Sequence, residues 1–94
     1  MYATVRRYQG ITDTAEAGRR VAEKFVPLLK EIPGFVAYYW VDAGDGVMAS
    51  MTVYEDRAGA EASNEKAAAW VRESAQDLYT HPPEVTPGEV VAHG

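Results

Sequence analysis

Residues 35–54 have the sequence FVAYYWVDAGDGVMASMTVY, and this stretch decides the fold. An aromatic run, Phe35–Val41, is followed by a turn cluster, Asp42–Gly46, and by a second apolar run, Val47–Tyr54. Aromatic and β-branched residues favour strands, and an Asp-Gly pair between two such runs favours a tight turn. The segment is therefore predicted to form a β-hairpin.

The two faces of this hairpin are both rich in apolar side chains, because side chains alternate between the faces of a strand. We expect Val41 to pair with Val47 and Tyr39 with Ala49. One face then carries Phe35, Ala37, Tyr39, Val41, Ala49, Met51 and Val53. The other carries Val36, Tyr38, Trp40, Met48, Ser50, Thr52 and Tyr54. We expect the first, almost wholly apolar face to lie under helices, and the second is too aromatic to be left in water.

The residues before the hairpin predict a strand and a helix. Tyr2–Tyr8 is rich in Tyr, Thr and Val and is typical of a strand. Asp13 is a good N-cap for a helix that ends at Pro33-Gly34. Its apolar stripe recurs at three- and four-residue spacing, in Val21, Phe25, Leu28 and Ile32. Pro27 lies inside this helix and removes one backbone donor, so we expect a kink there.

The residues after the hairpin predict a second helix and a last strand. Asp56 is the expected N-cap of a helix that runs to about Ser74, with a stripe of mostly small residues at Ala60, Asn64, Ala67 and Val71. The two prolines after His81 require an extended connection. We expect the last strand at Glu89–His93.

The predicted order is strand, helix, strand, strand, helix, strand over residues 1–94, taken as a single domain. This is the split βαβ order of ferredoxin-like α+β folds, with an antiparallel sheet and both helices on one face. The chain has nothing left to cover the second face of the sheet. We therefore expect a homodimer formed by sheet-to-sheet packing.

Composition excludes several classes of function. The 94 residues include 14 acidic and nine basic ones, a formal net charge of −5. Nucleic acids and anionic membranes require a basic surface, so neither is an expected partner. The chain has no cysteine and only two histidines, far apart at His81 and His93, so we expect no metal site. Without a bilayer-length apolar run or a signal segment, the expected location is the cytoplasm.

The sequence resembles the antibiotic-biosynthesis-monooxygenase proteins of the dimeric α+β barrel superfamily. The resemblance lies in Ile32–Phe35 at the start of the hairpin, in the aromatic hairpin itself, and in Val53–Asp56 leading into an Ala-rich helix that carries Trp70. It extends from Tyr2 to Val91. Many proteins of this type have no assigned activity, and the same fold supports several chemistries.

The resemblance implies a possible activity and a set of candidate residues. Catalytic members oxidise polycyclic aromatic compounds with molecular oxygen and no metal or flavin, so no cofactor is expected. They use asparagine, tryptophan, tyrosine and arginine side chains, and the corresponding candidates here are Asn64, Trp70, Tyr39 and Arg7. Asn64, Trp70 and Tyr39 are the catalytic candidates, and these three with Arg7 and Met51 are the candidate ligand-binding residues.

The haem-degrading branch of the superfamily fits the chain less well. It uses an asparagine on the first strand, with a tryptophan and a downstream histidine. The chain has Trp70 followed by His81, but Tyr2–Tyr8 contains no asparagine and His81 precedes two prolines on a loop.

Each candidate also has a structural interpretation. Trp70 suits a core anchor, and a buried Asn64 could bond a neighbouring backbone instead of a ligand. One of Arg6 and Arg7 must point inward, where it could hold an anionic substrate or an acidic residue, and the acidic residue is the expected partner. Two functions stay open: a cofactor-independent monooxygenase for a small aromatic or polyketide-like compound, and a non-catalytic small-ligand-binding or accessory protein.

Overall fold

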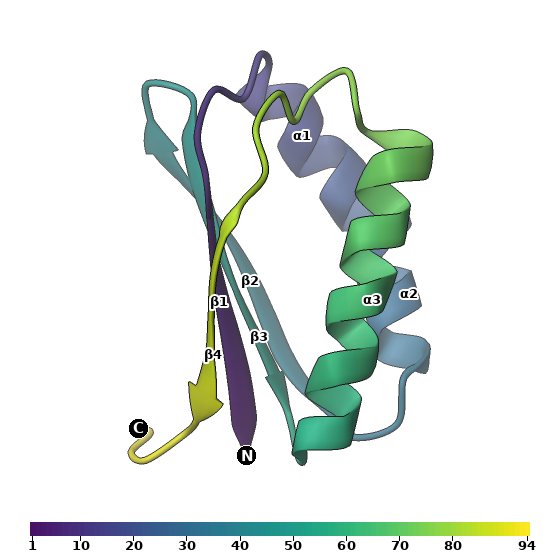
Figure 1. The fold of residues 1–94 in the computed structure, drawn as a ribbon, viewed down its shortest axis with the longest axis vertical. Helices are drawn as coiled ribbons and strands as arrows, with labels where there is room; N and C mark the ends of the chain where they lie inside the picture. The colour runs from purple at the N-terminus through teal and green to yellow at the C-terminus, as the bar shows by residue number, and fades with distance from the viewer.

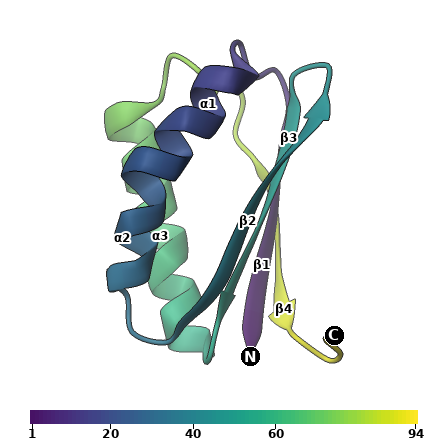
Figure 2. The same ribbon diagram turned by 180° about the vertical axis from the view of Figure 1, so that it is seen from behind.

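The computed structural model describes residues 1–94 as one antiparallel sheet with helices on one of its faces (Figures 1 and 2). The strands are β1 (Tyr2–Tyr8), β2 (Phe35–Gly44), β3 (Val47–Tyr54) and β4 (Glu84–Glu89). The helices are α1 (Thr14–Arg20), α2 (Val26–Glu31) and α3 (Arg57–Ser74). The strand order is β2-β3-β1-β4, so the ferredoxin-like α+β prediction is confirmed.

The first helical region is one rod in three parts. Asp13 accepts a hydrogen bond from the Glu16 N–H at 3.1 Å, as the N-cap prediction requires. A π-helical turn, Val21–Phe25, joins α1 to α2, and Pro27 lies in the first turn of α2. A proline is tolerated in a first turn because its missing N–H has no partner there. The irregularity expected at Pro27 is therefore accommodated by the π turn before it.

The hairpin turn is tighter than expected. β2 continues to Gly44, which pairs with Val47, so only Asp45 and Gly46 form the turn. Their φ angles of 54° and 75° are the left-handed pair that a two-residue type I′ turn requires. The expected pairing of Tyr39 with Ala49 is wrong, because Tyr39 pairs with Met51. The shift of two residues leaves the alternation of faces intact from Ala37 to Val41. A second irregularity, between Phe35 and Ala37, places Phe35 opposite Tyr54 and against the core.

The two faces of the hairpin are assigned the wrong way round by the sequence. The side chains that turn toward the helices are those of Tyr38, Trp40, Met48, Ser50, Thr52 and Tyr54. Tyr54 donates a hydrogen bond to the Leu29 carbonyl at 2.7 Å, and Tyr38 packs edge-on against Phe25. The opposite face is open, and Tyr39 on it is 62 % exposed. The face that the helices cover has more polar side chains than the open face. It is covered because its large aromatic rings interlock with the helices.

The last strand starts earlier than expected. β4 spans Glu84–Glu89 and not Glu89–His93, and it pairs only with β1. Pro87 stands within it, opposite Thr4. An edge strand has one unpaired side, so it tolerates a proline that an inner strand would reject.

The core is an aromatic cluster between the sheet and the helices. Trp70 on α3 contacts Phe25 with ring centroids 5.1 Å apart, and Tyr8 on β1 stacks on Tyr79 at the same centroid distance. Trp40 meets Tyr8 edge-on at 5.4 Å. These rings link β1, β2, the first helical region and α3 into one packed layer.

Candidate functional site

A cleft of about 530 Å³ opens between α3 and the β1–β4 edge of the sheet. β1 contributes Arg6 and Tyr8, and α3 contributes a row of side chains that begins at Asn64. The segment between α3 and β4 contributes Gln76 and residues 79–83 to the lining. Small residues on α3, Ala67 and Ala68, leave this space open. A volume of this size suits a drug-sized ligand.

Arg6 and Asn64 form a polar pair on the wall of the cleft. Arg6 donates from Nη2 to Oδ1 of Asn64 at 2.5 Å, which joins β1 to α3. Arginine can only donate hydrogen bonds, so this contact fixes the amide with its oxygen toward Arg6. The Nδ2 hydrogens of Asn64 are then left for another acceptor. Arg72, Gln76, Thr80 and His81 add further polar groups to the lining.

Two tyrosines, Tyr8 and Tyr79, line the cleft beside the pair. Burial raises the pKa of Tyr8, and the Arg6 charge opposes that change to a smaller extent. Burial also raises the pKa of Tyr79, and nearby Tyr8 adds to this. Both phenols are therefore protonated at neutral pH and can donate hydrogen bonds but cannot accept a proton from a ligand.

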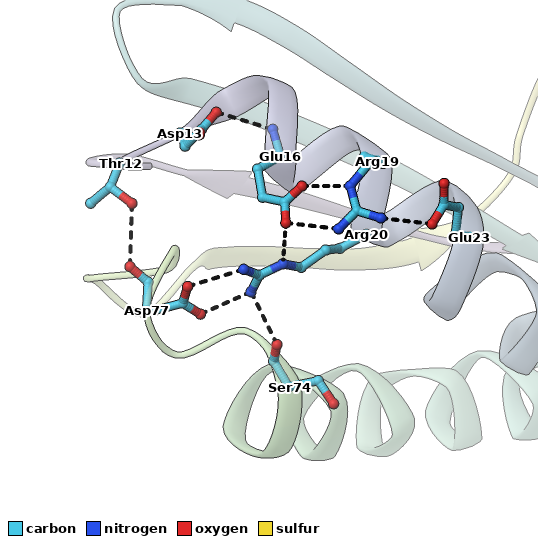
Figure 3. A network of polar contacts seen from close by, with 8 residues as sticks. All are labelled: Thr12, Asp13, Glu16, Arg19, Arg20, Glu23, Ser74 and Asp77. Atoms are coloured by element: carbon cyan, nitrogen blue, oxygen red, sulfur yellow. Dashed lines mark hydrogen bonds and ion pairs between the residues drawn. The ribbon is translucent and has the colours of Figure 1, made fainter.

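A polar network holds the end of α3 and the segment after it against α1 (Figure 3). Arg20 donates to both carboxylate oxygens of Asp77, at 2.9 and 3.1 Å, and to the Ser74 carbonyl at 3.2 Å. Glu16 accepts from Arg20 and from Arg19, at 2.9 and 2.6 Å. Hydrogen bonds from Arg19 and then Arg20 lower the pKa of Glu16 to about 2.

The segment is also held to the loop after β1. Thr12 donates from Oγ1 to the Asp77 carbonyl at 3.2 Å, and Thr80 donates to the Gly10 carbonyl at 2.7 Å. Ile11 and Tyr79 form a single antiparallel bridge. Tyr79, Thr80 and the residues that follow are thereby held in place in the wall of the cleft.

The candidate residues from the sequence are divided among three places. Asn64 lines the cleft, as described above. Trp70 is 7 % exposed and belongs to the aromatic core, where it lines only a small internal gap beside Phe25. Tyr39 and Met51 are 62 % and 42 % exposed on the open face of the sheet. The expectation that Tyr39 points toward the helices is therefore wrong.

Arg7 is separated from the cleft as well. It is exposed and lines a different, polar hollow with Gln9 and Glu84. His81 and the two prolines after it line both spaces and so form the wall between them. The inward arginine is Arg6, and its partner is an amide, not the acidic residue that we expected.

Sequence reasoning missed Arg6, Tyr8 and Tyr79 as lining residues. The available signal was the alternation along β1, which places Arg6 and Tyr8 on the same side as the covered face of the hairpin once that face is known. Tyr79 lies in a turn after α3, and the sequence contains no pattern that predicts where its ring points.

The structure was also searched for groups that could hold a metal ion and for helices that could cross a membrane. No group of three or more histidine, aspartate or glutamate side chains is arranged to hold a metal ion. None of the helices combines the length and apolar character needed to cross a bilayer.

Comparison with solved structures identifies the fold. A protein of unknown function from Nitrosomonas europaea superposes with a TM-score of 0.78 at 22 % identity, covering 99 % of this chain and 91 % of that one. A monooxygenase from the gene ActVA-Orf6 of Streptomyces coelicolor, in complex with nanaomycin D, gives 0.71 at 15 % identity and covers 98 % and 92 %. The cofactor-independent oxygenase SnoaB from Streptomyces nogalater gives 0.75 at 13 % identity and covers 98 % and 94 %.

The chain shares the fold of these oxygenases. Further structures with the same fold are described as antibiotic biosynthesis monooxygenases, so the resemblance drawn from the hairpin is confirmed at the level of the fold. No protein-family model and no curated protein sequence matches the chain.

Proposed function

We propose that the protein binds a small aromatic or polyketide-like compound in the cleft and oxidises it with molecular oxygen, without a metal or flavin. The observation that carries the proposal is a ligand-sized cleft at which a buried arginine orients a single asparagine amide. Two oxygenases with this fold, one of them in complex with nanaomycin D, support the reaction class.

The chemistry assigned to the site is stabilisation of a substrate anion. Asn64 donates from Nδ2 to the hydroxyl oxygen of the substrate, and negative charge on that oxygen strengthens the hydrogen bond. His81 is the one imidazole among the lining side chains, and none of them is a carboxylate, so His81 is the group available to take the hydroxyl proton. The resulting anion reduces oxygen, and a C–O bond forms at a ring carbon that carries hydrogen. Loss of that hydrogen as a proton and cleavage of the O–O bond leave one oxygen atom on the ring as a carbonyl, and the other leaves as water with the ring and hydroxyl protons.

Oxygen consumption tests this proposal. Purified protein is incubated with quinol-type aromatic compounds while oxygen uptake is followed, and labelled oxygen is traced into the product. We expect uptake by the native chain and a loss of at least about tenfold in Asn64→Ala, since one preorganised donor contributes that much or more. Glu65→Ala, an exposed neighbour on α3 outside the cleft, is the matched control. Equal rates in all three proteins would contradict an enzymatic role for the amide.

A non-catalytic binding protein is the second candidate. Trp70 lies in the core and Tyr39 on the other face, so two of the three catalytic candidates are outside the cleft. Saturable binding of the same compounds without oxygen uptake, and with loss of affinity in Asn64→Ala, is the outcome that favours this alternative.

A second copy of the chain is the partner we propose for the open face of the sheet. Val5, Met51 and Tyr39 lie side by side across β1, β3 and β2, and all three are exposed. A row of large apolar side chains across three strands favours a sheet-to-sheet homodimer, which removes it from water.

A further inference from the structure

We infer that the ligand of the cleft is an aromatic carboxylate with a hydroxyl group on the adjacent ring carbon. The inference rests on the proposed function in one respect: it takes the cleft to be the binding site. It starts from the environment of Arg6, which the reaction described above uses only to orient Asn64.

Arg6 is a buried cation without an acidic partner. Arg6 is 5 % exposed and takes part in none of the ion pairs of the molecule. Its one side-chain hydrogen bond is to neutral Asn64. A guanidinium is always charged and has five N–H donors. A buried charge without a counter-ion is costly, so an anion that reaches Arg6 gains a strong interaction.

The rest of the cleft favours an anion as well. None of its 14 lining residues is aspartate or glutamate, although the chain as a whole has 14 acidic residues and a net charge of −5. The other ionisable lining side chains are Arg72, His81 and the two tyrosines. Tyr8 and Tyr79 are protonated at neutral pH, as a tyrosine of ordinary or raised pKa is, so they add donors and no negative charge.

The remaining wall indicates the body of the ligand. Six lining residues are hydrophobic, namely Tyr8, Ala67, Ala68, Val71, Tyr79 and Val85. Val85 on β4 pairs with Arg6 on β1, so this apolar side chain stands directly beside the cation. The cleft therefore combines one buried cation, Arg6, with an apolar wall and with the exposed Arg72, which fits a flat apolar ring that carries a carboxylate.

The contact between Arg6 and Asn64 sets the position of the hydroxyl group. A guanidinium binds a carboxylate through two neighbouring donors, and the amide hydrogens of Asn64 serve a hydroxyl oxygen. Because the two side chains are hydrogen-bonded to each other, the groups that they bind must also be neighbours on the ligand. A carboxylate and a hydroxyl on adjacent carbons meet this requirement, and groups at distant positions of a fused ring system do not.

Binding of three hydroxynaphthalenes tests the inference by calorimetry. The first carries hydroxyl and carboxylate on adjacent carbons, the second replaces the carboxylate by a neutral carboxamide, and the third carries the carboxylate at the far end of the other ring. We expect the first to bind at least about tenfold more tightly than either of the others, as a charge-assisted hydrogen bond implies. Arg6→Met is expected to remove the preference for the carboxylate, and Arg6→Lys to retain part of it.

Arg57→Met is the matched control, because it removes the same charge from an exposed residue of α3 outside the cleft. If Arg6→Met does not fold, the Arg6 Nε–H resonance of the native protein is followed by NMR and is expected to move with the carboxylate but not with the carboxamide. Equal affinity for all three compounds overturns the inference and leaves the cleft as a binding site. A preference that survives in Arg6→Met also overturns it. No binding of any of them overturns the proposed function together with the inference.

Discussion

Arg6 on β1 and Asn64 on α3 are 58 residues apart in sequence and share the hydrogen bond that joins the sheet to the second helix at the cleft. The bond fixes the orientation of the amide. It is also the only side-chain hydrogen bond that Arg6 makes within the chain.

The coupling between these two residues can be measured by a double-mutant cycle. Asn64→Ala leaves a buried guanidinium donor without its partner, and we expect a loss of about 1–3 kcal/mol in the free energy of unfolding. Adding Arg6→Met removes the unpaired charge, so the double variant is expected to be more stable than the sum of the two single changes predicts. Urea denaturation of the four proteins provides the numbers. Strictly additive effects would show that the pair contributes nothing as a unit.

Trp70 is expected to affect stability and not ligand selection. Its ring packs against Phe25 in the core, so Trp70→Ala is expected to cost about 3–5 kcal/mol in the free energy of unfolding, and Trp70→Phe much less. Denaturation and ligand titration are carried out on the same samples. A Trp70→Phe protein of native stability that no longer binds the hydroxynaphthoate would place the indole in the site.

The two faces of β2 are expected to respond differently to a charge. Trp40 packs against Tyr8 and Tyr79 under the helices, so Trp40→Asp places a carboxylate in the core and is expected to unfold the chain. Tyr39→Asp changes an exposed residue of the open face. We expect it to keep the native circular dichroism spectrum and to weaken self-association by at least about tenfold.

Sedimentation velocity over a range of concentrations separates these outcomes. A folded Trp40→Asp protein would contradict the assignment of the covered face. A native protein that remains a monomer at every concentration, or a Tyr39→Asp protein as dimeric as the native one, would contradict the proposed homodimer.

Acid is expected to loosen the Arg20 network. Hydrogen bonds from Arg19 and Arg20 lower the pKa of Glu16 from 4.5 to about 2, and a hydrogen bond from Arg20 lowers the pKa of Asp77. A carboxyl whose pKa is lower in the folded state takes up its proton more readily when the chain is unfolded. Its contribution to stability is therefore present above the unfolded pKa and is lost as the pH falls toward the folded one.

The measurement is the free energy of unfolding as a function of pH. Between about pH 4.5 and 2 we expect a smaller slope in Arg20→Gln than in the native chain, since both carboxyls lose a partner. Arg57→Gln removes a cation from a different exposed pair, with Glu61, and controls for net charge. If the free energy of unfolding changes with pH equally in the native and Arg20→Gln proteins, protonation of these carboxyls is not linked to folding through Arg20.

Much of the fold follows from local signals in the sequence. Asp13 and Asp56 begin helices where their capping positions predict, and the Asp-Gly turn forms a hairpin. The choice of covered face does not follow, because alternation assigns residues to two faces and does not say which one the helices cover. An edge strand with a proline, as in β4, also breaks the usual pattern of a strand.

The candidate site is less predictable than the fold. The stripe on α3 places Asn64 at the cleft, but its partner comes from β1 and depends on the choice of face. Arg6 has no distinguishing feature in a segment that also contains Arg7. The segment that carries Tyr79 is positioned by the backbone bridge to Ile11 and by the pair of Arg20 with Asp77, which no local pattern predicts.

The segment after α3 is attached at two places, and the part between them can vary so that the cleft accepts a different ligand. The polar network and the bridge at Ile11 hold this segment through residue 80, and β4 begins at residue 84. His81, Pro82 and Pro83 lie between these two anchors, line the cleft, and take part in no backbone hydrogen bond of a helix or strand. Substitutions at Pro82 and Pro83 can therefore reshape this part of the cleft wall while the sheet, the core, His81 and the Arg6–Asn64 pair remain in place. New ligand preferences can arise there with little cost to folding.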